Sequence, residues 1–185
     1  MKKKIKIICV VLFGLTLLIT ACNNNHKKNA TTDNIDYSLY PNQEASDITV
    51  FFSDSNITVA KLSAKRSRIY QDKAKTFLDS SVYIEFFSRT TGNRISTLTA
   101  DSAIIDDLTK NMIAYGNVTV ISDSNQTKLQ TKLLEWNNKD KKVYTTEYIV
   151  ISSPVRIIRG FGFESDLGLK NYTIYKVSGE EFIQK

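Results

Sequence analysis

From about residue 44 to the C-terminus, apolar and polar residues alternate along most of the chain. This period of two is typical of β-strands, because successive side chains of a strand point to opposite faces of its sheet. The alternating segments are rich in Val, Ile, Thr, Tyr and Phe, and Pro occurs only at positions 41 and 154. Short segments with Asp and Asn separate them, and these residues favour turns because their side chains bond nearby backbone groups. The pattern predicts an all-β domain over residues 44–185.

Three segments of this region repeat one pattern, beginning at Lys61, Thr97 and Lys128. Each copy has a leucine at its second position, a small residue two positions later, and β-branched residues 20 and 22 positions after the leucine. The copies start 36 and 31 residues apart, a period typical of repeated supersecondary units. Since positions two apart share a face of a strand, we predict that the matched residues form inward ladders on one side of the sheet. They are Leu62, Ala64, Val82, Ile84, Leu98, Ala100, Val118, Val120, Leu129, Thr131, Ile149 and Ile151.

Each copy is expected to hold three strands: a first strand, a return strand and a third strand. Two interpretations of the inward ladders remain open at this point. Either they fill a closed core, or they line an apolar interior that a rolled sheet leaves open along one side. The expected first turns lie near Tyr70, Ile105 and Trp136, and the expected return strands lie around Phe77, Met112 and Val143.

The N-terminus has the pattern of a secretory signal. Four lysines precede an apolar run over residues 7–19, and the tetrapeptide ITAC ends at Cys22. This tetrapeptide resembles a bacterial lipobox, in which the cysteine is lipidated and becomes the new N-terminus. An uncleaved membrane-spanning helix is the alternative, but such a helix needs about 20 apolar residues. We therefore expect a signal peptide over residues 1–21, a lipid on Cys22 and a polar tether over residues 22–43.

Removal of the signal changes the charge and the cysteine count. The whole chain has a formal net charge of +6, but without the four signal lysines 21 Lys and Arg face 19 Asp and Glu, a net charge of +2. A nearly neutral chain gives no argument for nucleic-acid binding. Cys9 leaves with the signal and Cys22 carries the lipid, so we expect an exported domain without disulfides.

The sequence offers little for catalysis. The only histidine, His26, lies in the predicted tether, and neither a serine nucleophile motif nor a Gly-rich phosphate loop is present. Asp101, Asp106 and Asp107 are the carboxylates that a glycosidase pair or a metal site would need. A solvated turn is the preferred interpretation of Asp106 and Asp107. We expect no enzymatic activity, no cofactor and no metal.

The middle copy, LTADSAIIDDLTKNMIAYGNVTV at residues 98–120, resembles the signature of the OstA-like β-jelly-roll of lipopolysaccharide transport. Other motifs follow the order seen in the LptC family: PNQ at 41–43, FSD at 52–54 and GFGFESD at 160–166. The resemblance covers about residues 41–179. It implies a single rolled, V-shaped antiparallel β-jelly-roll. Many LptC proteins are held by an N-terminal transmembrane helix, whereas this chain has a lipobox.

The resemblance also implies a function. LptC-like proteins receive lipopolysaccharide from an inner-membrane ABC transporter and pass it to an LptA-like bridge protein, through similar rolls stacked edge to edge. The chain is therefore expected to be a periplasmic lipoprotein that binds lipopolysaccharide, anchored in the inner membrane, with the outer membrane left open as the alternative. Lys139, Lys141 and Lys142 are candidates for contact with lipid phosphates, although a solvated turn is the preferred interpretation.

The last alternating segment is the predicted partner edge. No later apolar segment exists to pair with it, so one of its edges is expected to be free for strand addition by the bridge protein. A structural or adhesive β-repeat lipoprotein without lipid transport is the alternative function, and another component of the same pathway is a third. The edge residues are Tyr172, Thr173, Ile174, Tyr175 and Val177.

Overall fold

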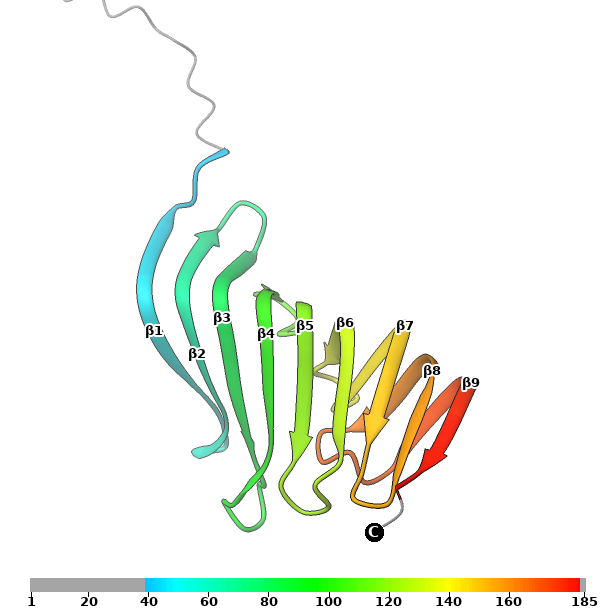
Figure 1. Ribbon diagram of the computed structural model, residues 1–185. Coiled ribbons are helices and arrows are strands. Elements are labelled where there is room, and N and C mark those ends of the chain that lie inside the picture. The colour runs from blue at the N-terminus through cyan, green and yellow to red at the C-terminus, as the bar shows by residue number, and fades with distance from the viewer. Residues whose placement is uncertain (1–38, 184–185) are drawn as a thin grey trace, which may run out of the picture. The chain divides into compact units, whose positions relative to one another are not determined.

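The computed structural model describes residues 39–183, which form one antiparallel sheet of nine strands (Figure 1). The strands lie side by side in chain order, because each pairs with the one before it. The predicted signal peptide, Cys22 and the tether up to residue 38 lie outside the described residues. The strands are β1 (Gln43–Asp54), β2 (Ile57–Tyr70), β3 (Lys75–Phe87), β4 (Arg94–Asp106), β5 (Met112–Ser122), β6 (Lys128–Asn137), β7 (Lys142–Ser152), β8 (Arg156–Asp166) and β9 (Tyr172–Phe182).

A row of β-bulges crosses the sheet through the middle of the strands. The register shifts between Asp79 and Val82 on β3 and between Tyr115 and Val118 on β5, and the other pairs from β2 to β8 shift at the same level. Bulges bend a strand and increase its twist. On β5 the bulge contains Gly116 at φ 71°, where an added Cβ would lie 2.4 Å from the Asp101 carboxylate. The positive φ and the close Asp101 side chain therefore favour glycine at this bend.

The row of bulges divides the sheet into two half-sheets. It folds them toward each other, so that both halves of each strand face one interior. On β4, Leu98 and Ala100 are buried before the bulge, and Ala103 and Ile105 are buried after it. The alternation is thus interrupted by one residue at the bend and resumes with the same face inward. Residues from both halves of the strands belong to one hydrophobic cluster. The predicted all-β roll is confirmed.

The prediction of three strands in each repeat is wrong. Its return strand and third strand are the two halves of one long bulged strand, which is β3, β5 or β7. Ser80 and Ser81 at the β3 bulge have positive φ of 59° and 64° and break the apolar pattern as a turn would. Each repeat is therefore a two-stranded hairpin.

The twelve residues of the inward ladders are all buried, with 0 to 9 % of their surface exposed. Leu129 on β6, for example, pairs with Val120 on β5 and Ile151 on β7, and all three lie in the central cluster. Across residues 39–183, β1 and β9 each pair with one strand only, so each leaves one backbone edge unpaired.

Candidate functional site

An apolar cavity of about 380 Å³ lies between the tips of the two half-sheets. On one side are strand ends next to the β1–β2 and β3–β4 turns, with Phe52, Ala60 and Phe86. On the other side are strand ends next to the β4–β5 and β6–β7 turns. The Phe86 and Trp136 rings, one from each side, have centroids 6.3 Å apart. The remaining apolar lining residues are Val59, Leu62, Ile84, Phe87, Ile95, Ile105, Met112 and Leu167.

Toward β9 the two half-sheets are held together. The Asn125 side-chain amide, in the β5–β6 loop, donates a hydrogen bond to the backbone carbonyl of Leu169, in the β8–β9 loop, at 3.2 Å. The Leu169 side chain is fully buried in the core cluster, although its backbone has a φ of 51°, which is unusual for leucine. Phe163 on β8 is also fully buried there. The interior is thus filled near β8 and β9 and hollow between the strand ends of β1 to β6.

Three cationic side chains lie around the cavity. Arg89 comes from the β3–β4 turn, Lys110 from the β4–β5 turn and Lys141 from the β6–β7 turn, and all three are exposed. Arg89 forms an ion pair with Asp54 in the β1–β2 hairpin. The Lys141 ammonium lies 5.9 Å from the centroid of the Trp136 ring, a cation–π distance. The apolar interior therefore opens beside positive charge.

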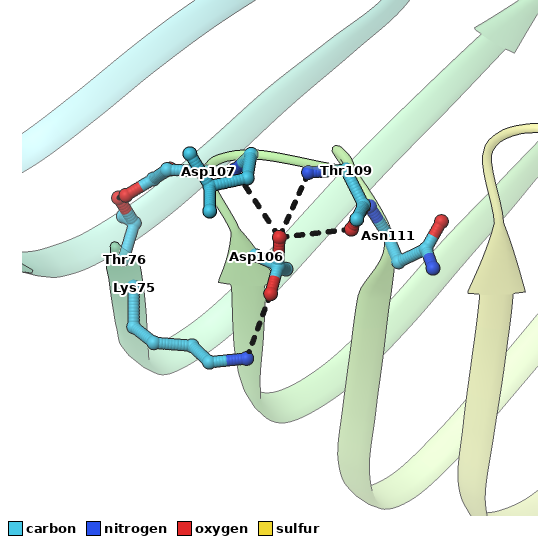
Figure 2. A network of polar contacts seen from close by, with 7 residues as sticks. Lys75, Thr76, Asp106, Asp107, Thr109 and Asn111 are labelled. Atoms are coloured by element: carbon cyan, nitrogen blue, oxygen red, sulfur yellow. Dashed lines mark hydrogen bonds and ion pairs between the residues drawn. The ribbon is translucent and has the colours of Figure 1, made fainter. Parts of the chain in front are cut away.

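The turn that carries Lys110 is fixed by the Asp106 carboxylate (Figure 2). One carboxylate oxygen accepts hydrogen bonds from the Thr109 backbone amide at 2.8 Å and from the Thr109 hydroxyl at 2.9 Å. The other oxygen meets the Lys75 ammonium at 3.0 Å. The Thr109 amide and Lys75 hold the pKa of Asp106 well below its usual value, so this carboxylate stays ionised. Asp106 thus closes the turn as an ionised hydrogen-bond acceptor.

Neighbouring turns are joined side by side. The Asp107 carboxylate accepts a hydrogen bond from the Thr76 hydroxyl at 3.0 Å, which links the start of β3 to the β4–β5 turn. The Asn138 backbone amide donates to the Asn111 side chain at 2.9 Å, which links the β4–β5 and β6–β7 turns. Lys110 and Lys141 are therefore presented by two turns that are bonded to each other.

The sequence predicted only part of this site. Of the twelve ladder residues, Leu62 and Ile84 line the cavity, nine others belong to the hydrophobic cluster away from it, and Thr131 is a buried polar residue. Phe52, Phe86 and Trp136 were missed as lining residues, because they sit at strand ends and were not among the predicted ladder positions. In the predicted edge strand, Tyr172 and Ile174 pack against the core, whereas Thr173, Tyr175 and Val177 are exposed.

The carboxylates considered for a glycosidase pair or a metal site, Asp101, Asp106 and Asp107, bond to neighbouring side chains at turns and at a bulge. Asp101 accepts a hydrogen bond from the Asn117 side chain at 2.8 Å, next to the β5 bulge. Within residues 39–183, no group of three or more His, Cys, Asp or Glu side chains is placed to hold a metal ion. That same range contains no helix of sufficient length and apolarity to cross a membrane.

A family described as lipopolysaccharide-assembly, LptC-related, matches residues 5–180. The chain belongs to this family. The periplasmic protein LptH from Pseudomonas aeruginosa, described as the LptA homologous component of the conserved lipopolysaccharide transport device, has a similar fold at a TM-score of 0.51 and 10 % identity. The similarity covers 68 % of this chain and 94 % of that one. None of the curated proteins matches this chain.

The predicted resemblance to the LptC family is confirmed by the family match. Family membership assigns the chain to lipopolysaccharide transport in the periplasm, as a transport protein and not as an enzyme.

Proposed function

We propose that this chain is a membrane-anchored component that binds lipopolysaccharide, receives it from the inner-membrane ABC transporter and passes it to an LptA-like bridge protein. The apolar cavity between the half-sheets carries this proposal. Burial of acyl chains is worth roughly 0.8 kcal/mol per methylene, so a lipid with several chains needs an apolar path through the aqueous periplasm. A structural or adhesive protein needs no such cavity.

Attachment at Cys22 is the second part of the proposal. The family match begins at residue 5 and therefore includes the apolar run and the ITAC sequence. A lipid on Cys22 would hold the roll at the inner membrane, in the position that a transmembrane helix gives to many LptC proteins. The length of the predicted tether would then limit how far the roll can extend from the membrane.

Transfer to the bridge protein is the third part. The outer edges of β1 and β9 are unpaired in the described sheet, and such edges bind a further strand through main-chain hydrogen bonds. LptH, described as a periplasmic component of the transport device, has the same kind of roll, which supports stacking of similar sheets edge to edge. The edge formed by β9 is the proposed contact for the bridge protein.

Filling the cavity tests the function directly. Ala60 lines the cavity, between its strand partners Phe52 on β1 and Phe86 on β3. Ala60→Trp places an indole where the acyl chain would lie. Exclusion of only two methylene groups costs about 1.6 kcal/mol, or more than tenfold in affinity. We therefore expect the variant to lose at least tenfold in lipopolysaccharide binding and in transfer to the bridge protein.

The matched control is Thr99→Trp, which adds the same side chain at an exposed position of β4. This control should bind and transfer lipopolysaccharide as the wild type does. Both variants should remain folded, as judged by thermal unfolding. Normal binding by Ala60→Trp, or equal loss in both variants, would overturn the assignment of the cavity.

A further inference from the structure

We infer that Arg89, Lys110 and Lys141 form a headgroup site that binds the phosphate groups of the lipid while its acyl chain occupies the cavity. The inference rests on the proposed function and adds a recognition element to it. The ligand it requires is an amphiphile with an anionic, phosphorylated headgroup.

The position of the three cations is the first argument. Arg89 stands on the half-sheet tip that also carries Phe86, and Lys110 and Lys141 stand on the facing tip that carries Met112 and Trp136. A lipid whose chain lies between the tips therefore has its polar end beside cations on both sides. Phosphate oxygens accept strong charge-assisted hydrogen bonds from Arg and Lys.

The second argument is that two of the three cations, Lys110 and Lys141, have no compensating charge among residues 39–183. Among residues 39–183, no Asp or Glu side chain lines the cavity. In the same part of the chain neither Lys110 nor Lys141 takes part in an ion pair, and Asp54 is the acidic partner of Arg89. By contrast, the neighbouring Lys142, which is the first residue of β7, forms an ion pair with Glu164. The cations at the cavity thus have donors available for an added anion.

The fixed geometry of the turns is the third argument. Lys110 lies in the turn closed by Asp106, and its own backbone amide donates to the Asp106 carbonyl at 2.8 Å. Asn138 bonds this turn through the Thr109 carbonyl at 3.1 Å, and its side-chain oxygen accepts a hydrogen bond from the Lys141 ammonium at 2.8 Å. Asn138 therefore places Lys141 beside the turn of Lys110. Prior placement of the cations reduces the ordering cost of binding.

The three lysines of the predicted solvated turn, Lys139, Lys141 and Lys142, have different surroundings in the structure. Only Lys141 of the three lines the cavity. Lys139 is exposed on the same turn, and Lys142 points to Glu164 on β8. Of these three lysines, the inference concerns Lys141 alone.

The experiment uses the full chain in two double variants that remove the same charge. Lys110→Gln with Lys141→Gln removes two cations of the site and leaves Arg89 paired with Asp54. Lys132→Gln with Lys176→Gln is the control, because both lysines are exposed and neither lines the cavity. The probes are labelled bisphosphorylated lipid A and the dephosphorylated form of the same molecule, which keeps the acyl chains.

The wild type should bind the phosphorylated probe about tenfold more tightly than the dephosphorylated one, and this preference should shrink as salt is raised. The Lys110 and Lys141 variant should lose the preference and keep its affinity for the dephosphorylated probe. The control variant should behave as the wild type. Inorganic phosphate at the same concentration as the phosphorylated probe should not displace that probe, because the acyl chains supply most of its affinity.

The alternative results separate the two proposals. A wild type that binds both probes equally overturns the headgroup site and leaves the cavity function intact. Equal loss of preference in the control variant also overturns it, because net charge would then explain the effect. Displacement by inorganic phosphate makes the cations a free-phosphate site and overturns the lipid assignment. A wild type that binds neither probe overturns the proposed function itself.

Discussion

Leu129→Ala tests whether the interior between β5 and β7 is a closed core. Leu129 is fully buried, and its strand partners Val120 and Ile151 are 2 % and 1 % exposed. The substitution removes three carbon atoms, which corresponds to about 2.4 kcal/mol of lost transfer free energy. A cavity left in a packed core adds to this loss, so the free energy of unfolding should fall by about 3 to 5 kcal/mol.

Urea denaturation and thermal unfolding measure this loss. For a domain of this size each kcal/mol lowers the midpoint by about 2 to 4 °C, so a decrease on the order of 10 °C is expected. The urea m-value should stay constant, because the surface exposed on unfolding changes little. Thr99→Ala, at an exposed position of β4, should change the free energy of unfolding by no more than about 0.5 kcal/mol.

A loss below about 1 kcal/mol for Leu129→Ala would refute the reasoning. It would mean that Leu129 faces an open groove, where truncation leaves no unfilled space inside packed atoms. The two interpretations of the ladders left open by the sequence are thus separated by one measurement.

Three further predictions follow from the anchor, the turn and the edge. Cys22→Ser should abolish metabolic labelling with fatty acid and leave an unprocessed precursor, and persistent labelling would contradict the lipobox. The lowered pKa of Asp106 means that its contribution to stability is complete above the ordinary aspartate pKa and is lost as pH falls toward the lower folded value. Asp106→Asn should therefore flatten the acid side of the stability profile, and an unchanged profile would show that the carboxylate contributes nothing. On β9, Thr173 and Ile174 are consecutive, and in an antiparallel pair the amides of consecutive residues point to opposite edges. One of Thr173→Pro and Ile174→Pro should lower stability, and the other should block capture of the bridge protein; two variants that both capture it normally would exclude this edge.

The strands were predictable because their signal is local. Alternation and the repeat around Leu62, Leu98 and Leu129 identified the inward face, which depends only on the period of two. The division into three strands failed because a bulge and a turn use the same residues. Gly116 and Asn117 have positive φ and interrupt the apolar pattern, as turn residues do, and only pairing with β4 and β6 shows that the strand continues.

Most of the candidate site could not be predicted, because it depends on how the two half-sheets meet. Phe52 and Trp136 are far apart in the sequence and belong to strands that do not pair, yet they line one cavity. The same holds for Asn125 and Leu169, which join the loops at the filled end. The hydrophobic period and the β-propensity of the residues predict single strands and their neighbours. The contacts across the interior arise only when the row of bulges folds the sheet.

The contrast between the filled and hollow parts of the interior is itself an argument for binding. Protein interiors leave few voids larger than a water molecule, because atoms beside a void lose dispersion contacts. The 380 Å³ apolar cavity lies next to a closed core around Leu129 and Phe163, and the side chains that line it have fewer packing partners than those of the core. Residues selected for stability alone would fill it, and cavity-filling substitutions commonly add about 0.5 to 2 kcal/mol. Ala60→Trp should accordingly unfold at a higher temperature than the wild type while it binds less lipopolysaccharide. A variant that lost both stability and binding would show that the space around Ala60 is already occupied by packed side chains and is not a place for the lipid.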